Sequence, residues 1–186
     1  MKTLFSLPSG LWVPTSPATD RATPTHTRAL LYFVVMDAAT RIRTARSTER
    51  LTQADLAKRA GTTQSAVAAY ESGSRNPSAS TLARLLDASG FRPSHVVDQH
   101  RADICRIAER YRGHDVRVFG SVGRNDDTPT SDIDLLIRFE RGTSLLDVSS
   151  LEYELTELLG VDVDVVSEGG LRLPKHQPIL DDARPV

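Results

Sequence analysis

Gly120-Ser121-Val122-Gly123-Arg124 is the stretch that decides the fold of the second half of this chain, together with the Ser131-Asp132-Ile133-Asp134-Leu135-Leu136-Ile137 that follows it. Residues 116–119 come just before it and are alternating and β-branched, which indicates a strand that runs into Gly120. Residues 133–137 form a second apolar run of strand length. Side chains two positions apart on a strand share a face, so we expect Asp132 and Asp134 to point the same way.

Two carboxylates held together with no lysine between them repel each other, and a divalent cation removes that repulsion. Paired Mg²⁺ ions in phosphoryl-transfer sites lie about 3.5–4 Å apart, a gap that a carboxylate pair bridges. Gly120-Ser121 supplies the complementary half, a tight strand-to-helix turn whose backbone N–H groups and hydroxyl suit phosphate oxygens. The alternative interpretation is structural: a turn glycine, a serine helix cap and a solvated acidic strand edge.

These motifs resemble the polymerase-β-like nucleotidyltransferases, and most closely their minimal nucleotidyltransferase (MNT) branch. That family combines Gly-Ser, then Ser-Asp-x-Asp, then a third aspartate on a later strand. Residues 161–166 alternate like a strand, and Val163-Asp164-Val165-Val166 matches the family there. The resemblance therefore implies Asp164 as the third carboxylate, while Asp162 shares its face and stays open as the alternative.

What the resemblance implies for chemistry is specific. Asp132, Asp134 and Asp164 would be catalytic and would hold two Mg²⁺ ions, and ATP or another NTP would be the substrate. The nucleotide-binding residues would be Gly120, Ser121 and Arg124. Family members usually follow that arginine with glycine, whereas this chain has Asn125.

Composition divides the chain into two parts. Residues 28–112 carry a net charge of +6 and residues 113–186 a net charge of −8, which suggests a nucleic-acid module followed by something else. Hydrophobic content of 39% and charged content of 25% are those of a soluble globular protein. The single Cys105 excludes an internal disulfide and suits a cytoplasmic protein. No apolar run approaches the length of a membrane span, so we expect no membrane partner.

The basic part predicts short helices near 38–47, 51–61, 62–73 and 78–90, separated by tight turns, as in a helix-turn-helix. Residues 42–91 resemble the Xre/Cro-type repressors through Leu51-Thr52-Gln53, Tyr70-Glu71-Ser72-Gly73 and Asn76-Pro77-Ser78. The resemblance implies operator DNA as partner and a homodimer on a two-fold site. The alternative is that these polar residues are ordinary solvated helix surface. The implied base readers are Gln64 and Ser65, with a methyl contact from Ala68 or Ala69, and the implied phosphate contacts are Gln53, Arg43, Arg75 and Asn76.

We therefore predict an α+β protein in three parts. Residues 1–35 are expected to be a disordered N-terminal segment, and Met36 is our hypothesis for the true start. Residues 36–92 would be the all-α helix-turn-helix domain, and residues 93–186 a small α/β nucleotidyltransferase domain with a mixed sheet and a leading linker helix at 94–111. A short closing helix is expected within 171–186. An amphipathic helix is expected at 144–159, with its buried face made by Leu145, Leu146, Val148, Leu151, Leu155, Leu158 and Leu159.

The functional expectation is the antitoxin of a toxin–antitoxin pair. In the MNT family the usual partner is a HEPN-type ribonuclease toxin that is silenced by transfer of a nucleotide, often AMP, to a tyrosine, and the Xre-like half would repress the operon. One alternative is a regulator whose nucleotidyltransferase domain binds nucleotide or a partner without turnover. Another is an aminoglycoside- or RNA-directed enzyme. The lack of an evident drug-binding domain argues against an aminoglycoside-directed enzyme. The few aromatic residues available for base stacking argue against an RNA-directed one.

Overall fold

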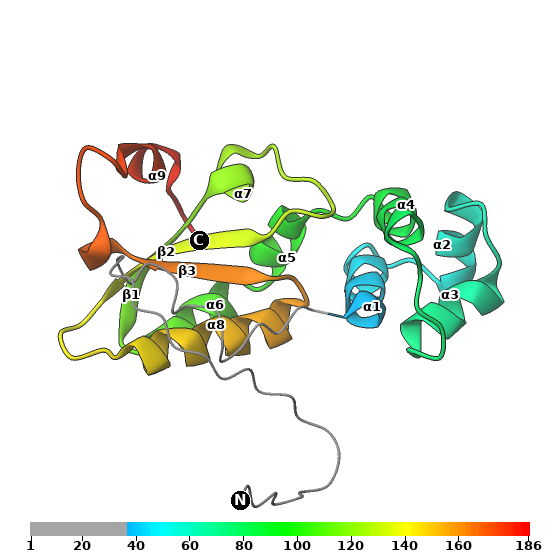
Figure 1. Cartoon of the computed structure of the whole chain (residues 1–186), viewed down its shortest axis with the longest axis horizontal. Coiled ribbons are helices and arrows are strands. Elements are labelled where there is room, and N and C mark those ends of the chain that lie inside the picture. Colours follow the sequence, from blue (N-terminus) through cyan, green and yellow to red (C-terminus); the bar gives the residue numbers. More distant parts are fainter. Residues whose placement is uncertain (1–36) are drawn as a thin grey trace, which may run out of the picture. The chain divides into compact units, whose positions relative to one another are not determined.

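The first described part of the chain is a bundle of four short helices. The computed structural model describes residues 37–186 (Figure 1), so our predictions for residues 1–35 and for a start at Met36 lie outside the described residues. The bundle consists of α1 (Ala38–Thr48), α2 (Gln53–Arg59), α3 (Gln64–Glu71) and α4 (Ala79–Ser89). The predicted helical first domain is therefore confirmed.

Each helix of the bundle begins at a residue whose side chain caps it. Thr52 and Asp55 form a reciprocal capping box at the start of α2. Thr63 accepts a hydrogen bond from the backbone N–H of Ala66, and Ser78 caps α4 in the same way. Gly90 ends α4 in the left-handed conformation at φ 75°, which a glycine adopts without strain.

The bundle has its own apolar core. Ile42 of α1, Leu56 of α2, Val67 of α3 and Leu85 of α4 are each at most 1% exposed and belong to one cluster. Each helix thus turns an apolar residue towards the inside of the bundle. Helices this short are not stable alone, and burial of their apolar faces against one another stabilises them.

Two helices, rather than the predicted single linker helix, lead into the second domain. They are α5 (Pro93–Gln99) and α6 (Arg101–Arg110). The helix is interrupted at His100, whose backbone (φ −113°, ψ 17°) is not helical. The N–H of His100 closes α5 on the carbonyl groups of Val96 and Val97, and its own carbonyl opens α6 by accepting from Ile104. Both helices contribute residues to the same apolar core, so the break lets two short stripes face it.

A mixed four-stranded sheet organises the second domain, as predicted. Its strands are β1 (Gly113–Phe119), β2 (Ile133–Phe139), β3 (Val163–Ser167) and β4 (Arg184–Pro185), in the order β3-β2-β1-β4. β1 runs antiparallel to β2 and β4, and β2 runs parallel to β3. The connections are α7 (Gly120–Arg124) between β1 and β2, α8 (Leu145–Leu159) between β2 and β3, and η1 (Glu168–Gly170) with α9 (Gln177–Asp182) between β3 and β4.

The helices lie on both sides of this sheet, with α6 and α8 on one side and α7 and α9 on the other (Figure 1). Ile133, Leu135 and Ile137 of β2 are fully buried in one cluster with Leu151 and Leu155 of α8. Because side chains alternate along a strand, Asp134 must lie on the opposite face from these three. The core thus fixes the direction in which that carboxylate points.

The predicted buried face of α8 was too wide. Leu151, Leu155 and Leu159 are buried, but Leu145 is 82% exposed and Leu146 is 74% exposed. The buried leucines recur every four residues, whereas Leu146 precedes Leu151 by five, which places it about 140° around the helix. Both leucines lie in the first turn after the Ser144 cap, outside the stripe that meets the sheet.

The C-terminal segment holds a strand that we did not predict. The expected closing helix is α9, but β4 then pairs Arg184 with Val118 and Pro185 with Arg117 at the edge of β1. Two residues are too short a strand to leave an alternation pattern in the sequence. Between residues 37 and 186, no helix is both long and apolar enough to cross a membrane.

Candidate active site

Three carboxylates converge at one end of β2 and β3. Asp134 is the second residue of β2, and the register pairs it with Asp164 of β3 on one side and Phe119 of β1 on the other. Paired residues on neighbouring strands share a face, and Asp132 joins them because it precedes Asp134 by two. Each of Asp132, Asp134 and Asp164 offers a carboxylate oxygen within 4.8 Å of the others. Asp132 and Asp164 are exposed, and Asp134 is half-buried.

The structure separates the two candidates for the third carboxylate. β3 begins at Val163, so Asp164 lies inside the strand and Asp162 just before it. The backbone carbonyl of Asp162 accepts a hydrogen bond from the N–H of Ile133 at 2.9 Å, which ties the starts of the two parallel strands together. Only Asp164 belongs to the carboxylate cluster described above.

The Gly120 turn lies directly against this cluster. Gly120 has a φ of 64°, and a Cβ added to it would overlap the carboxylate of Asp134. A side chain at position 120 is thus excluded twice, by the left-handed backbone and by the neighbouring oxygen. The turn brings the backbone of Gly120 and Ser121 beside Asp134. A phosphate group bound between the turn and a carboxylate-bound cation would require this arrangement.

The electrostatics of the cluster are unfavourable without a cation. Burial, together with the charges of Asp132 and Asp164, raises the pKa of Asp134 to about 6, while the charge of Arg124 acts in the opposite direction. An all-oxygen set of closely spaced carboxylates is what hard divalent cations such as Mg²⁺ prefer. The residues present therefore fit a magnesium site.

Arg124, at the end of α7, is oriented by two acids. Its Nη1 donates to Asp182 Oδ2 at 2.6 Å, and its Nε donates to Asp126 Oδ2 at 3.2 Å. Asn125 follows it in the left-handed conformation at φ 60°. Asparagine tolerates that conformation better than most residues, so Asn125 adopts the conformation for which glycine would be the first choice at this position.

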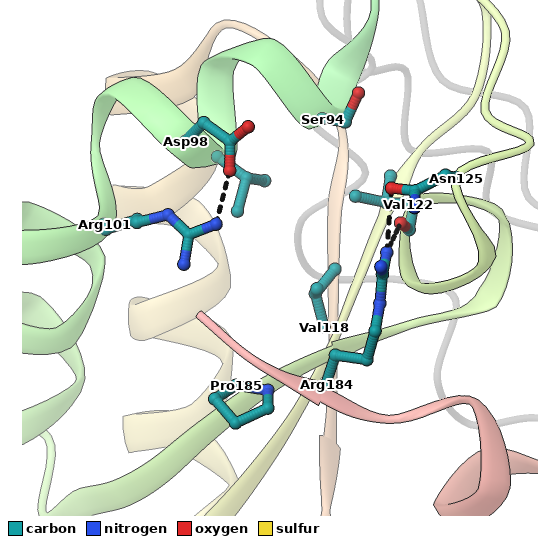
Figure 2. Close-up of a pocket in the computed structure, with 9 residues that line it drawn as sticks. Ser94, Asp98, Arg101, Val118, Val122, Asn125, Arg184 and Pro185 are labelled. Carbon is teal, nitrogen blue, oxygen red and sulfur yellow. Dashed lines mark hydrogen bonds and ion pairs between the residues drawn. The ribbon is translucent and has the colours of Figure 1, made fainter.

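The C-terminal segment braces α7, the short helix that begins at Gly120. Arg184 donates to the backbone carbonyl of Val122 at 2.8 Å and to Asn125 Oδ1 at 3.0 Å (Figure 2). Gly123 packs so closely on the backbone carbonyl of Asp182 that a Cβ there would clash. These contacts lie beside a cavity of about 160 Å³ whose lining, drawn in Figure 2, includes none of the three clustered carboxylates. Sequence reasoning missed this brace because no motif marks the tail.

The implied base readers lie on an accessible part of the helix-turn-helix domain. Gln64 and Ser65 are the first two residues of α3 after the Thr63 cap, and both are exposed. Ala68 and Ala69, one turn further on, are half-buried. Arg75 and Asn76 follow α3 and are exposed, with the Arg75 guanidinium 5.4 Å from the centre of the Tyr70 ring.

Two of the implied phosphate contacts have partners inside the domain instead. Gln53 donates its amide to Glu71 Oε2 at 2.9 Å, and Arg43 donates to the backbone carbonyl of Glu71 at 2.5 Å. Arg46, which sequence reasoning did not single out, donates to Glu71 Oε1 at 2.6 Å. Glu71 is 5% exposed, so this network joins α1, α2 and α3 around one buried carboxylate. The sequence signal that could have revealed this network is the position of Glu71 at the end of a helix whose buried face is otherwise apolar.

Two protein families match this chain, one toward each end of the described residues. The nucleotidyltransferase domain family matches residues 97–186, and a helix-turn-helix domain family matches residues 37–100. The Methanocaldococcus jannaschii protein MJ0435, provisionally named a protein adenylyltransferase, is 46% identical over 66 residues, which cover 36% of this chain and 71% of the relative.

A second curated relative belongs to the same family, and one solved structure is also similar. The protein adenylyltransferase MntA of Thermococcus cleftensis is 39% identical over 66 residues, which cover 36% of this chain and 67% of that protein. A solved structure, provisionally described as a minimal nucleotidyltransferase, is 40% identical and aligns with 50% of this chain and 95% of its own at a TM-score of 0.46. The chain therefore belongs to the nucleotidyltransferase family of the protein adenylyltransferases, and it joins that enzyme domain to an N-terminal helix-turn-helix domain.

Proposed function

We propose that this protein is an antitoxin that transfers AMP from ATP to a HEPN-type toxin and represses its own operon through the helix-turn-helix domain. The observation that carries the enzymatic half is the convergence of Asp132, Asp134 and Asp164 beside the Gly120 turn. Three carboxylates are clustered at one end of β2 and β3, beside a glycine that admits no side chain. This arrangement suits the binding of a triphosphate with its metal ions.

The same three aspartates would hold two Mg²⁺ ions. Bound magnesium would neutralise the charge of the triphosphate and polarise the phosphorus under attack. The raised pKa of Asp134 and the mutual repulsion behind it support this assignment, because a cation relieves both. Gly120 and Ser121 would bind phosphate oxygens with backbone N–H groups and a hydroxyl, and Arg124 would contribute a positive charge from the end of the same short helix.

The chain's own residues would then orient a single in-line displacement. The acceptor hydroxyl oxygen bonds to the α-phosphorus, the bond from that phosphorus to the bridging oxygen breaks, and pyrophosphate leaves. Asp164 would orient the hydroxyl and take its proton, because its side chain is exposed to an incoming acceptor. Positioning and charge neutralisation supply the rate enhancement, since the transferring group needs little covalent help.

A protein acceptor fits the size of the catalytic domain. From residue 113 onward the chain forms one small sheet with its covering helices, and a partner has to present the acceptor. The relatives named as protein adenylyltransferases support a protein in that role. The HEPN-type toxin rests on the resemblance to the MNT branch.

The DNA-binding half would act through α3. Gln64 and Ser65 would read base edges in the major groove, with a methyl contact from Ala69, and Arg75 and Asn76 would contact phosphates. Arg43 and Gln53 would reach phosphates only through the N–H groups that Glu71 leaves unused. A homodimer on a two-fold operator would place two such helices on the DNA, in the cytoplasm where ATP and DNA are both present.

Incubation with ATP labelled at the α-phosphate and with the product of the adjacent gene tests this proposal. Label on that protein supports the antitoxin. Label on RNA instead would point to an RNA-directed enzyme. Absence of label from every acceptor, with ATP still bound, would overturn the enzymatic half and leave a regulator that binds nucleotide without turnover.

A further inference from the structure

One acidic residue near the carboxylate cluster is buried for no reason that the reaction requires. Asp127 lies in the loop between α7 and β2, in a stretch that reads as polar and solvated, yet it is only 1% exposed. A buried carboxylate needs hydrogen-bond partners. Without them, its removal from water costs roughly several kcal/mol of folding free energy. Its partners therefore indicate what it does.

The partners of Asp127 lie at the start of α5. Its Oδ2 accepts a hydrogen bond from the backbone N–H of Ser94 at 2.9 Å, and its backbone carbonyl accepts one from Arg92. Arg92 is the N-cap residue of α5, and its own side chain does not cap the helix. Asp127 thus supplies from a distant loop the cap that the local sequence lacks.

On its other side, Asp127 is joined to the metal site by one closed turn. The N–H of Thr128 donates to Ser131 Oγ at 2.9 Å, and the N–H of Ser131 donates to the carbonyl of Thr128 at 3.0 Å. Asp132 follows immediately. Because two hydrogen bonds close this turn, we expect a shift of Asp127 to be passed on to Asp132.

The start of α5 is also held by the helix-turn-helix domain. Only Phe91, which is 3% exposed, separates the end of α4 at Gly90 from Arg92. Glu49, the C-cap of α1, lies 2.6 Å from His95 Nδ1 through its Oε1. The joint formed by Glu49, Arg92, Ser94 and His95 is thus shared by the first domain and the loop that carries Asp132.

We infer that Asp127 is a positioning residue, which holds Asp132 in place for metal binding and connects the metal site to the helix-turn-helix domain through this joint. The inference rests on the proposed function, because it takes Asp132 as a metal ligand. Anything that shifts α1 against α5 then changes the affinity for metal, and metal binding reciprocally favours one arrangement of the joint.

The test measures binding of Mn²⁺ alone to the full chain, by electron paramagnetic resonance of the free ion, with thermal unfolding of each variant in parallel. Asp127→Ala is expected to weaken Mn²⁺ binding about fivefold, less than the roughly 10- to 100-fold typical of groups that touch a ligand directly. Asp127→Asn keeps an oxygen that accepts from Ser94, so it is expected to stay within about twofold of the wild type. Equal weakening by both variants would mean a simple charge effect and would overturn the inference.

Two further variants keep the test informative if Asp127→Ala fails to fold. Arg92→Ala removes an exposed side chain from the same joint and is expected to weaken Mn²⁺ binding about twofold. Arg106→Ala is the matched control, because among residues 37–186 this exposed arginine of α6 pairs with its neighbour Asp103 alone and is expected to change nothing. An Arg92→Ala variant that binds Mn²⁺ like Arg106→Ala would contradict the inference.

The connection to the first domain has its own pair of variants. Glu49→Ala is expected to weaken Mn²⁺ binding about twofold from a residue of α1 that is no ligand. Asp55→Ala removes the capping box of α2 and is expected to lower thermal stability without changing Mn²⁺ affinity. Equal affinities in these two variants would disprove the connection. A wild-type chain that binds no Mn²⁺ would instead contradict the proposed active site, so the two failures are distinguishable.

Discussion

In the folded chain the surroundings of Asp134 favour the protonated, uncharged form of its carboxyl group. Its pKa, raised from 3.8 to about 6 by burial and by the charges of Asp132 and Asp164, exceeds the value expected in the unfolded chain. The folded state therefore binds the proton more tightly between these two pH values, and stability from this group is lost as pH rises through them. Such repulsion is expected at a functional site rather than in a purely structural one.

Asp134→Asn is accordingly expected to stabilise the metal-free protein. The gain in the free energy of unfolding at pH 7.5 should be about 1 kcal/mol. It is smaller than the full pKa shift implies, because solvent screens the charges around the half-exposed Asp134. Urea unfolding in EDTA at pH 7.5 and pH 4 measures it, and the gain should vanish at the lower pH. Added Mg²⁺ should stabilise the wild type and leave the variant unchanged. A variant less stable than the wild type at pH 7.5 would refute this assignment of the repulsion.

Gly120 tests the steric side of the same site. Gly120→Ala meets both the left-handed backbone and the Asp134 carboxylate, so we expect a loss of roughly 2–4 kcal/mol in the free energy of unfolding. Gly61→Ala is the control, because Gly61 has a φ of 61° and no atom of the described residues lies within 4 Å of an added Cβ. That variant should lose only about 1 kcal/mol. Equal losses in the two variants would contradict the close approach of Gly120 to Asp134.

Among the elements, the helix caps and the strands β1, β2 and β3 were the most predictable from the sequence. Thr63, Ser78 and Gly90 end or begin helices where their residue types predict it, since these rules depend on local hydrogen bonding alone. The carboxylate cluster was predictable for the same reason, because a strand period of two decides which side chains share a face. Spacing alone places Asp162 and Asp164 on the same face, and the family resemblance favoured Asp164. The start of β3 at Val163 and the carboxylate cluster separate the two.

Elements whose form depends on distant partners were not predictable. Leu145 and Leu146 belong to an apolar helix in sequence, but the position of the sheet decides which stripe is covered. The break at His100 and the pairing of β4 likewise follow from tertiary contacts. Asp127 is a buried acid in a polar loop, and Glu71 is a buried acid at the end of α3. The arrangement of Ser94 around the first and of Arg46 around the second explains why each is buried.

The Glu71 network gives a prediction for the helix-turn-helix elements. Burial alone would raise the pKa of Glu71, but hydrogen bonds from Arg46 and Gln53 outweigh it and lower the pKa below its ordinary 4.5. Stability from this group is therefore present above pH 4.5 and lost as pH falls below it. Glu71→Gln should cost about 2 kcal/mol at pH 7, and the difference from wild type should shrink towards pH 3.5. Urea unfolding followed by circular dichroism measures both, and a difference independent of pH would contradict the ionised network.

For the whole molecule, the two proposed activities should be separable by mutation. Gln64→Ala is expected to weaken binding to DNA from upstream of the chain's own gene by roughly 1–3 kcal/mol and to leave nucleotide transfer intact. Arg75→Ala should instead reduce the salt dependence of DNA binding by about one unit of slope. Band-shift titrations at several salt concentrations measure both. Loss of transfer in Gln64→Ala would contradict the division of labour between the domains.

The most direct test of the central claim compares ATP labelled at the α-phosphate with ATP labelled at the γ-phosphate, using wild type and the Asp132→Ala, Asp134→Ala double variant. Circular dichroism first establishes that the double variant is folded. Our account predicts that the wild type transfers α-label but no γ-label to its acceptor, and that the folded double variant transfers neither. Transfer of γ-label, or undiminished transfer of α-label by the double variant, would contradict it.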